Sequence, residues 1–171
     1  MDQLPPSTSN QNLFNPPILL ATWFGAGLLP KAPGTWGSIA ALPFAWWIAS
    51  LGGYLAMLAV VLLVFVVGWW VSEIYLQRVG GEDPGPIVID EVVGQWIAVS
   101  FVTPDLILYG LGFLLFRFAD ILKPWPIGWA DRRIKGGFGI MFDDVLAGIY
   151  AAALLYVLQK IDTDGLLWRV F

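Results

Sequence analysis

The chain has 171 residues, of which 58% are hydrophobic and 13% are charged, and it carries a formal net charge of −4 at pH 7. No Asp, Glu, Lys or Arg occurs from Ala32 to Ser72, which is typical of an integral membrane protein and excludes an ordinary soluble domain. The acidic balance argues against a nucleic-acid partner, because there is no surplus of cations to neutralise phosphates.

The N-terminal residues 1–17 are polar and rich in Pro, and we expect them to be a disordered tail without the basic region of a signal peptide. Residues 18–29 are apolar but too few to span a bilayer as a helix, so we predict an interfacial or re-entrant piece. Residues 18–160 are predicted to form one helical membrane domain that carries the active site. Residues 161–171 are predicted to be a C-terminal tail.

The rest of the domain is predicted to be all-α and polytopic. Residues 39–75 are too long for one crossing and are broken at 50–53, which predicts a helical hairpin. Residues 92–116 are interrupted at 103–105 by a Pro, which predicts a second hairpin. With a final helix at 145–159, the chain has about five short membrane segments, in two hairpins plus one helix.

An odd number of crossings places both charged loops on the same side of the membrane. Seven of the nine Lys and Arg residues then lie on that side, with Lys160 and Arg169 on the other. Because cytoplasmic loops are enriched in Lys and Arg, the charged loops are predicted to be cytoplasmic.

Acidic residues gather in two of the predicted loops. Residues 87–92 resemble residues 140–145, and we expect each acidic pair to begin an apolar helix that has a glycine four residues on, Gly94 and Gly148, for close helix approach. Since the chain has no Cys and no His, an all-oxygen site for a hard cation such as Mg²⁺ is the metal site that it can build. Helix capping is the alternative for Asp90 and for Asp143, each taken singly. The candidate ligands are Asp83, Asp90, Glu91, Asp120, Asp143 and Asp144.

The cations near these acids are candidates for binding a phosphate. Arg117, Asp120 and Lys123 share one helical face if the helix continues past residue 116, although a surface ion pair is the alternative. The prolines that follow should project Lys123 at the membrane surface, as a phosphate ligand requires. Residues 131–135 are predicted to be a solvated loop attracted to an anionic lipid bilayer, with at most one of their charges in the site.

Two glycine-containing stretches, residues 30–38 and 136–139, could present backbone amides to an anion. The alternative for the first is a tight turn with Ser38 as a helix cap. The sequence contains neither a Walker loop nor an Asp-x-Asp-x-Thr phosphatase signature.

Several segments resemble the phosphatidylglycerophosphatase A family: 30–38 (PKAPGTWGS), 83–94 with its IVIDEVVG, 116–127 (FRFADILKPWPI), Asp131 and Arg132 with Gly136 and Gly137, and 139–148 (GIMFDDVLAG). The resemblance covers nearly all of residues 25–150. It implies a Mg²⁺-dependent, multi-pass enzyme of the bacterial inner membrane that converts phosphatidylglycerophosphate to phosphatidylglycerol and inorganic phosphate.

With this resemblance the candidate residues take roles in an in-line attack of water on the phosphomonoester. Asp90, Asp120, Lys123 and Asp144 are expected to be catalytic, and the six acids above to bind the metal. An aspartyl-phosphate intermediate stays open. The expected substrate-binding residues are Lys31, Thr35, Ser38, Arg117, Lys123 and Arg132.

Two other functions remain open from the sequence. Carboxylates at the ends of membrane helices also bind and pass cations in ion-coupled transporters and channels. Such a protein would distribute its acids so that access can alternate, whereas these are confined to one face. A lipid phosphotransferase would give an alcohol-dependent product instead of free phosphate.

Overall fold

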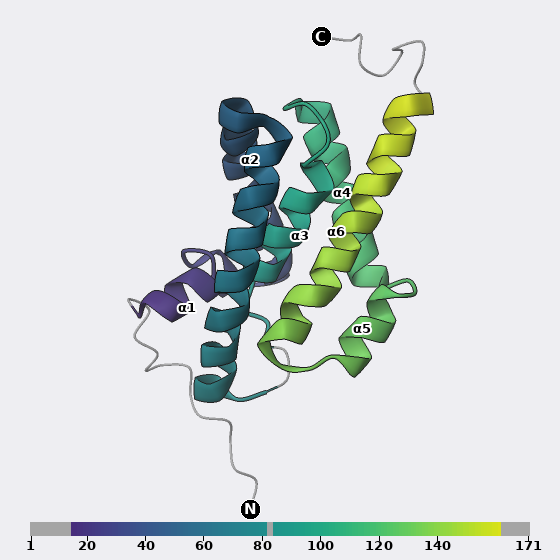
Figure 1. Cartoon of the computed structure of the whole chain (residues 1–171). Helices are drawn as coiled ribbons and strands as arrows, with labels where there is room; N and C mark the ends of the chain where they lie inside the picture. Colours follow the sequence, from purple (N-terminus) through teal and green to yellow (C-terminus); the bar gives the residue numbers. More distant parts are fainter. Residues whose placement is uncertain (1–14, 82–83, 162–171) are drawn as a thin grey trace, which may run out of the picture.

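The computed structural model describes residues 15–81 and 84–161, and within these ranges it contains helices and no strand. The helices are α1 (Pro16–Ala21), the short 3₁₀ helix η2 (Ala26–Leu28), α2 (Pro33–Val79), α3 (Ile89–Val99), α4 (Leu106–Leu122), α5 (Ile127–Arg133) and α6 (Gly136–Ile161) (Figure 1). The all-α prediction is therefore confirmed. Most of each expected tail lies outside the described residues; only the part next to α1 and the part at the end of α6 are described. Asp83 also lies outside the described residues.

Helix α2 is interrupted at Gly53, whose backbone has φ 62° and ψ −158°. Glycine adopts a positive φ without the steric cost that a Cβ brings, so this is where the long apolar run can bend. The sequence predicted a break at 50–53. Among the described helices, α2 and α6 are long and apolar enough to cross a membrane.

The six residues between α3 and α4 form the second break. The side chain of Asp105 caps α4 by accepting hydrogen bonds from the backbone amides of Ile107 and Leu108, at 2.9 and 3.0 Å. A capping carboxylate satisfies amides that have no partner in the first turn of a helix. The break lies where Pro104 and its neighbours predicted it.

The beginning of α6 differs from the prediction. The helix begins at Gly136 rather than at residue 145, so Asp143 and Asp144 lie about two turns inside it and cannot be its N-terminal caps. Gly137 donates its backbone amide to Glu73 Oε2 of α2 at 2.8 Å, which caps the glycine-rich start of the helix. A Cβ at Gly137 would lie 2.7 Å from the carbonyl oxygen of Trp69, so glycine permits this close approach.

Two further local expectations were wrong. Residues 127–133 form the short helix α5 instead of a solvated loop. Ser38 is not a cap, because α2 begins at Pro33, and the hydroxyl of Ser38 donates to the carbonyl oxygen of Gly34 at 2.8 Å inside the helix.

Helix α3 is the centre of the structure. All of its residues except Glu91 are buried, and it packs against α2, α4 and α6. It approaches α6 closely at two glycines, since a Cβ at Gly94 would lie 2.7 Å from the carbonyl oxygen of Asp144 and a Cβ at Gly148 would lie 2.4 Å from the carbonyl oxygen of Gly94. The predicted role of these glycines is confirmed, and it brings the acids of the two helices together.

The two ends of the helical bundle differ in character. At one end, the bend of α2 and the connection between α3 and α4 line a mostly apolar cavity. At the other end lie the α2–α3 connection, α5 and the start of α6 (Figure 1). The charged residues that sequence analysis selected are concentrated at this second end.

Candidate active site

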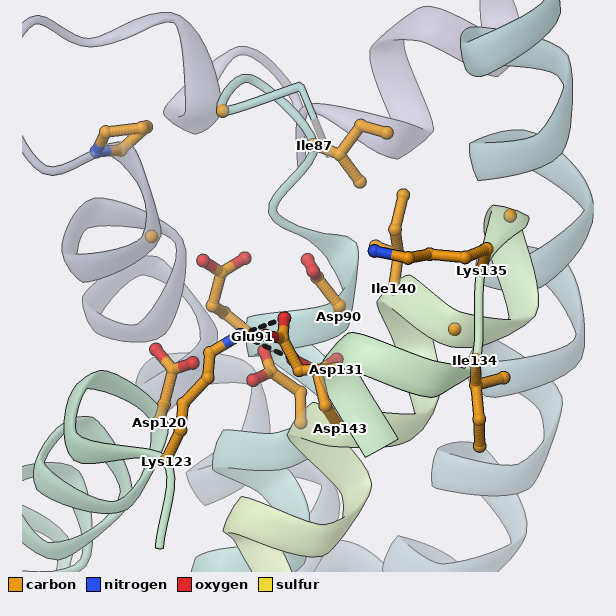
Figure 2. A pocket seen from close by; sticks show the side chains of 16 residues that line it. Ile87, Asp90, Glu91, Asp120, Lys123, Asp131, Ile134, Lys135, Ile140 and Asp143 are labelled. Carbon is orange, nitrogen blue, oxygen red and sulfur yellow. Dashed lines mark hydrogen bonds and ion pairs between the residues drawn. The ribbon is translucent and has the colours of Figure 1, made fainter. Parts of the chain in front are cut away.

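A cavity of about 230 Å³ opens at the charged end of the bundle (Figure 2). Its wall combines side chains from α2, α3, α4, α5 and α6 with the connections between them. Six carboxylates and two lysines line it: Asp90, Glu91, Asp120, Asp131, Asp143, Asp144, Lys123 and Lys135. Five of the six predicted metal ligands are thus in one place.

Three of these acids form a compact cluster. One carboxylate oxygen from each of Asp90, Glu91 and Asp144 lies within 4.8 Å of the others. Asp90 and Asp144 are buried, and Glu91 Oε2 and Asp144 Oδ2 are buried with no hydrogen-bond partner among the described residues. Buried carboxylate oxygens without donors are costly, and a hard cation would satisfy them.

The side chain of Glu91 is held from two sides. Arg117 of α4 places Nη1 3.8 Å from Glu91 Oε1 and 2.7 Å from Asp120 Oδ2. Gly34 of α2 lies against the same carboxylate, because a Cβ there would come within 2.0 Å of Glu91 Oε1. Helix α4 does continue past Phe116, so the predicted shared face of Arg117 and Asp120 is present. Arg117 itself stands behind the cavity wall and does not line it.

Lys123 ends α4 and bridges two acids. Its Nζ lies 2.5 Å from Asp131 Oδ1 and 2.8 Å from Asp143 Oδ2 (Figure 2). Burial alone would lower the pKa of Lys123, but its hydrogen bonds to Asp131 and Asp143, and their negative charges, raise that pKa above its ordinary value. The lysine is therefore a fixed positive charge at the edge of the acidic cluster.

Besides Arg117, four more of the six predicted substrate-binding residues do not line the cavity: Lys31, Thr35, Ser38 and Arg132. Lys31 and Arg132 are exposed, and Ser38 is occupied within its own helix. Residues 33 and 34, at the start of α2, are the part of the 30–38 segment that reaches the cavity wall. The segment contributes close packing around the acids.

Sequence analysis did not select Asp131 or Lys135 for the site, and both line the cavity. The charged run 131–135 offered four charges with no periodicity to distinguish them. The helical turn of α5 resolves this, because it directs Asp131 toward Lys123 while Arg132 and Arg133 remain exposed. The Pro residues after Lys123 turn the chain back into α5. They were the sequence feature that could have indicated that a residue of α5 lies close to Lys123.

The family described as phosphatidylglycerophosphatase A matches residues 19–159. The chain belongs to the phosphatidylglycerophosphatase A family. The matched region contains every described residue of the acidic cluster and of the Lys123 bridge.

Individual members of the family are similar over most of their length. Phosphatidylglycerophosphatase A of Escherichia coli K12 is 42% identical over 149 residues, which is 86% of this chain and 86% of that protein. Phosphatidylglycerophosphatase A of Haemophilus influenzae Rd is 43% identical over 150 residues, which is 86% of this chain and 91% of that protein.

A third relative has a different name. A Bacteroides thetaiotaomicron protein, 40% identical over 82% of this chain and 92% of its own length, carries the provisional name phosphatidylinositol-3-phosphatase. No solved structure matches the chain significantly.

Proposed function

We propose that this protein hydrolyses the terminal phosphomonoester of phosphatidylglycerophosphate and releases phosphatidylglycerol and inorganic phosphate. The observation that carries the proposal is the convergence of Asp90, Glu91 and Asp144 in a cavity that also holds Lys123. A buried acidic cluster beside a fixed ammonium suits a cation and a phosphate together. Two relatives more than 40% identical carry the name of this activity.

We propose Mg²⁺ as the cofactor, held by Asp90, Glu91 and Asp144. The donor set consists of carboxylate oxygens, the chain has no Cys or His, and two of the buried oxygens have no hydrogen-bond partner among the described residues. Mg²⁺ prefers such oxygen ligands and commonly shares its shell with water and substrate phosphate. When bound, the ion would supply positive charge that offsets the charge of the phosphate and of the transition state.

In the proposed reaction, water attacks the phosphorus of the monoester in line with the departing glycerol oxygen, which takes up a proton from solvent and leaves as the hydroxyl of phosphatidylglycerol. Asp120 lines the cavity outside the three-acid cluster and is oriented by Arg117, so we assign it as the base that accepts the proton of the water. Lys123, held by Asp131 and Asp143, stabilises the negative charge on the phosphoryl oxygens.

We further propose that the chain crosses the bacterial inner membrane five times. The two parts of α2 on either side of Gly53, then α3, α4 and α6, would be the crossings, with the site on the cytoplasmic side. The exposed apolar side chains of α2 and α6, including Leu62, Trp70 and Leu154, support a lipid environment. The short α3 is surrounded by other helices, so it need not face lipid along its whole length.

The proposed function is tested by phosphate release from defined lipids. Purified protein in mixed micelles with Mg²⁺ is expected to release phosphate from phosphatidylglycerophosphate, and Asp144→Asn is expected to reduce the release by roughly a hundredfold or more. Phosphatidylinositol 3-phosphate serves as the competing substrate. No release from phosphatidylglycerophosphate, or a preference for the inositol lipid, would contradict the proposal.

A further inference from the structure

Helix α3 carries a buried polar side chain that the proposed reaction does not use. Gln95 is fully buried, and neither its amide oxygen nor its amide nitrogen has a hydrogen-bond partner among the described residues. Burying an amide without a partner opposes folding, so such a group in a native fold needs a physical reason. The position of Gln95 relative to the acidic cluster supplies one.

Contacts on both sides of Gln95 place it between α3 and α4. One turn before it, Glu91 has Oε1 3.8 Å from Arg117 Nη1 of α4. One turn after it, Val99 lies against Gly112 of α4, where a Cβ would come within 2.7 Å of Val99 Cγ1. Because residues four apart share a helical face, Gln95 faces α4 between these two contacts. Helical side chains lean toward the N-terminus, which directs the Gln95 amide toward Arg117.

The side chain of Arg117 enters the same junction from α4. Its Nη1 lies 2.7 Å from Asp120 Oδ2, and a Cβ at Gly34 of α2 would lie 3.1 Å from its Nη2. Its Nε is buried and has no hydrogen-bond partner within the described part of the chain. Helix α3 lies between α2 and α4 (Figure 1). Arg117 is therefore enclosed by three helices and has an unused donor, while Gln95, one turn from Glu91, has an unused acceptor.

We propose that Gln95 is a positioning residue that holds Arg117 through one internal water molecule, which accepts the Nε hydrogen of Arg117 and donates to Gln95 Oε1. Buried waters typically join polar groups that have no other partner. Arg117 in turn orients Asp120 and Glu91, so Gln95 acts on the reaction without touching the substrate. The inference rests on the proposed function, in which these two acids are the base and a metal ligand.

The kinetic test replaces Gln95 by an apolar side chain of similar size. Gln95→Leu is expected to lower kcat about tenfold, the scale of one hydrogen bond to a charged group, and to change the KM less than about threefold. The thermal unfolding midpoint should not fall, because leucine removes an amide from a buried position. Arg117→Lys keeps the positive charge but lacks the Nε donor, and in this background Gln95→Leu should change kcat less than about threefold.

Tyr109→Phe is the matched control. The hydroxyl of Tyr109 is also buried without a hydrogen-bond partner among the described residues, but Tyr109 lies about two turns from Arg117 along α4. The variant removes a buried polar group from the same bundle and leaves the surroundings of Gln95 intact. It is expected to leave both kcat and the KM unchanged.

A spectroscopic readout does not depend on activity. In protein that contains isotope-labelled arginine, the buried Nε–H of Arg117 should exchange slowly with solvent, show a nuclear Overhauser effect to bound water, and be identified by its loss in Arg117→Lys. Gln95→Leu should shift this resonance and remove the effect, whereas Tyr109→Phe should change neither.

The outcomes separate the inference from the function beneath it. An unchanged kcat in Gln95→Leu, an equal fall in the Arg117→Lys background, or an unmoved Nε–H resonance would overturn the role of Gln95. So would an equal loss of kcat in Tyr109→Phe, which would indicate a general effect of altering the core. Absence of phosphate release by the unaltered protein would instead remove the proposed function, and the resonance would still show whether Gln95 holds Arg117.

Discussion

Lys123 and Asp143, twenty positions apart, are joined by a 2.8 Å hydrogen bond between Nζ and Oδ2. The same ammonium binds Asp131, so one side chain connects the end of α4 to both α5 and α6. A lysine in this position has two roles, because it fixes three helices around the cavity and places positive charge beside the acidic cluster.

Replacing Lys123 should separate these roles. Lys123→Ala is expected to reduce turnover by roughly a hundredfold, the scale on which a positioned electrostatic group acts, and to lower the thermal unfolding midpoint. Asp131→Asn keeps an acceptor for Lys123 but removes a charge, and it should lower turnover much less. Phosphate release and thermal unfolding measured on both variants check this. Normal turnover in the folded fraction of Lys123→Ala would show that the bridge is structural only.

Replacing the carboxylates is predicted not to lower the thermal unfolding midpoint, in contrast to replacing Lys123. Asp90→Asn, Asp120→Asn and Asp144→Asn should each reduce turnover by roughly a hundredfold or more, because each removes a ligand or the base. Like charges confined in a cavity oppose folding, so these variants should unfold at temperatures at least as high as that of the parent.

A deletion of residues 2–12 is the control for the carboxylate variants, and it should change turnover little. Aggregation of the Asn variants together with normal turnover of the fraction that folds would mean that the carboxylates have a structural role. Assays normalised to folded protein, by size-exclusion chromatography, make this distinction.

The features that sequence analysis predicted well depend on local chemistry. Gly53 and Pro104 mark breaks because a glycine permits a positive φ and a proline lacks an amide donor, and neither effect needs a distant partner. The face shared by Arg117 and Asp120 follows from helical spacing, and the pair is indeed 2.7 Å apart.

The features that were missed depend on contacts between distant parts of the chain. Helix α6 begins at two glycines, Gly136 and Gly137, and Glu73, 64 positions away from Gly137, accepts the amide hydrogen of Gly137 there. No local pattern indicates that bond. Likewise, the run of charges at 131–135 does not reveal which of them faces Lys123, because that depends on how α5 packs against α6.

The acidic cluster predicts a requirement for a divalent cation. EDTA should abolish phosphate release, and added Mg²⁺ should restore it, because Asp90, Glu91 and Asp144 would otherwise repel both one another and the phosphate. Mn²⁺ binding, followed by electron paramagnetic resonance, gives a readout that does not depend on activity. Asp144→Asn should weaken that binding, and Arg133→Gln should not. Full activity in metal-free buffer would refute the metal requirement.

The five-crossing arrangement predicts a labelling pattern. Because the native chain has no Cys, single cysteines can be introduced at Gly85 and Arg133 on one side and at Ser50 and Thr103 on the other, all at exposed positions. In oriented vesicles a membrane-impermeant thiol reagent should label the first pair from the cytoplasmic side and the second pair from the opposite side. Opposite labelling of Gly85→Cys and Arg133→Cys would rule out the arrangement, since both loops border the same cavity.

The contact between Gly34 and Glu91 predicts a loss of activity from the addition of one methyl group. In Gly34→Ala the new Cβ would lie 2.0 Å from Glu91 Oε1 and 3.1 Å from Arg117 Nη2, so the carboxylate has to move away from its position in the cluster. Displacements of this size at a catalytic centre cost up to about a hundredfold in rate, and we expect a fall in turnover of tenfold or more. Because the Glu91 side chain can shift into the cavity, the thermal unfolding midpoint should change little.

Gly110→Ala is the matched control, since Gly110 lies within α4 with no atom within 4 Å of a new Cβ. Alanine there should stabilise the helix by about 1 kcal/mol and leave turnover intact. Equal turnover in the two variants would show that the position of Glu91 does not matter to the reaction and would remove it from the metal site.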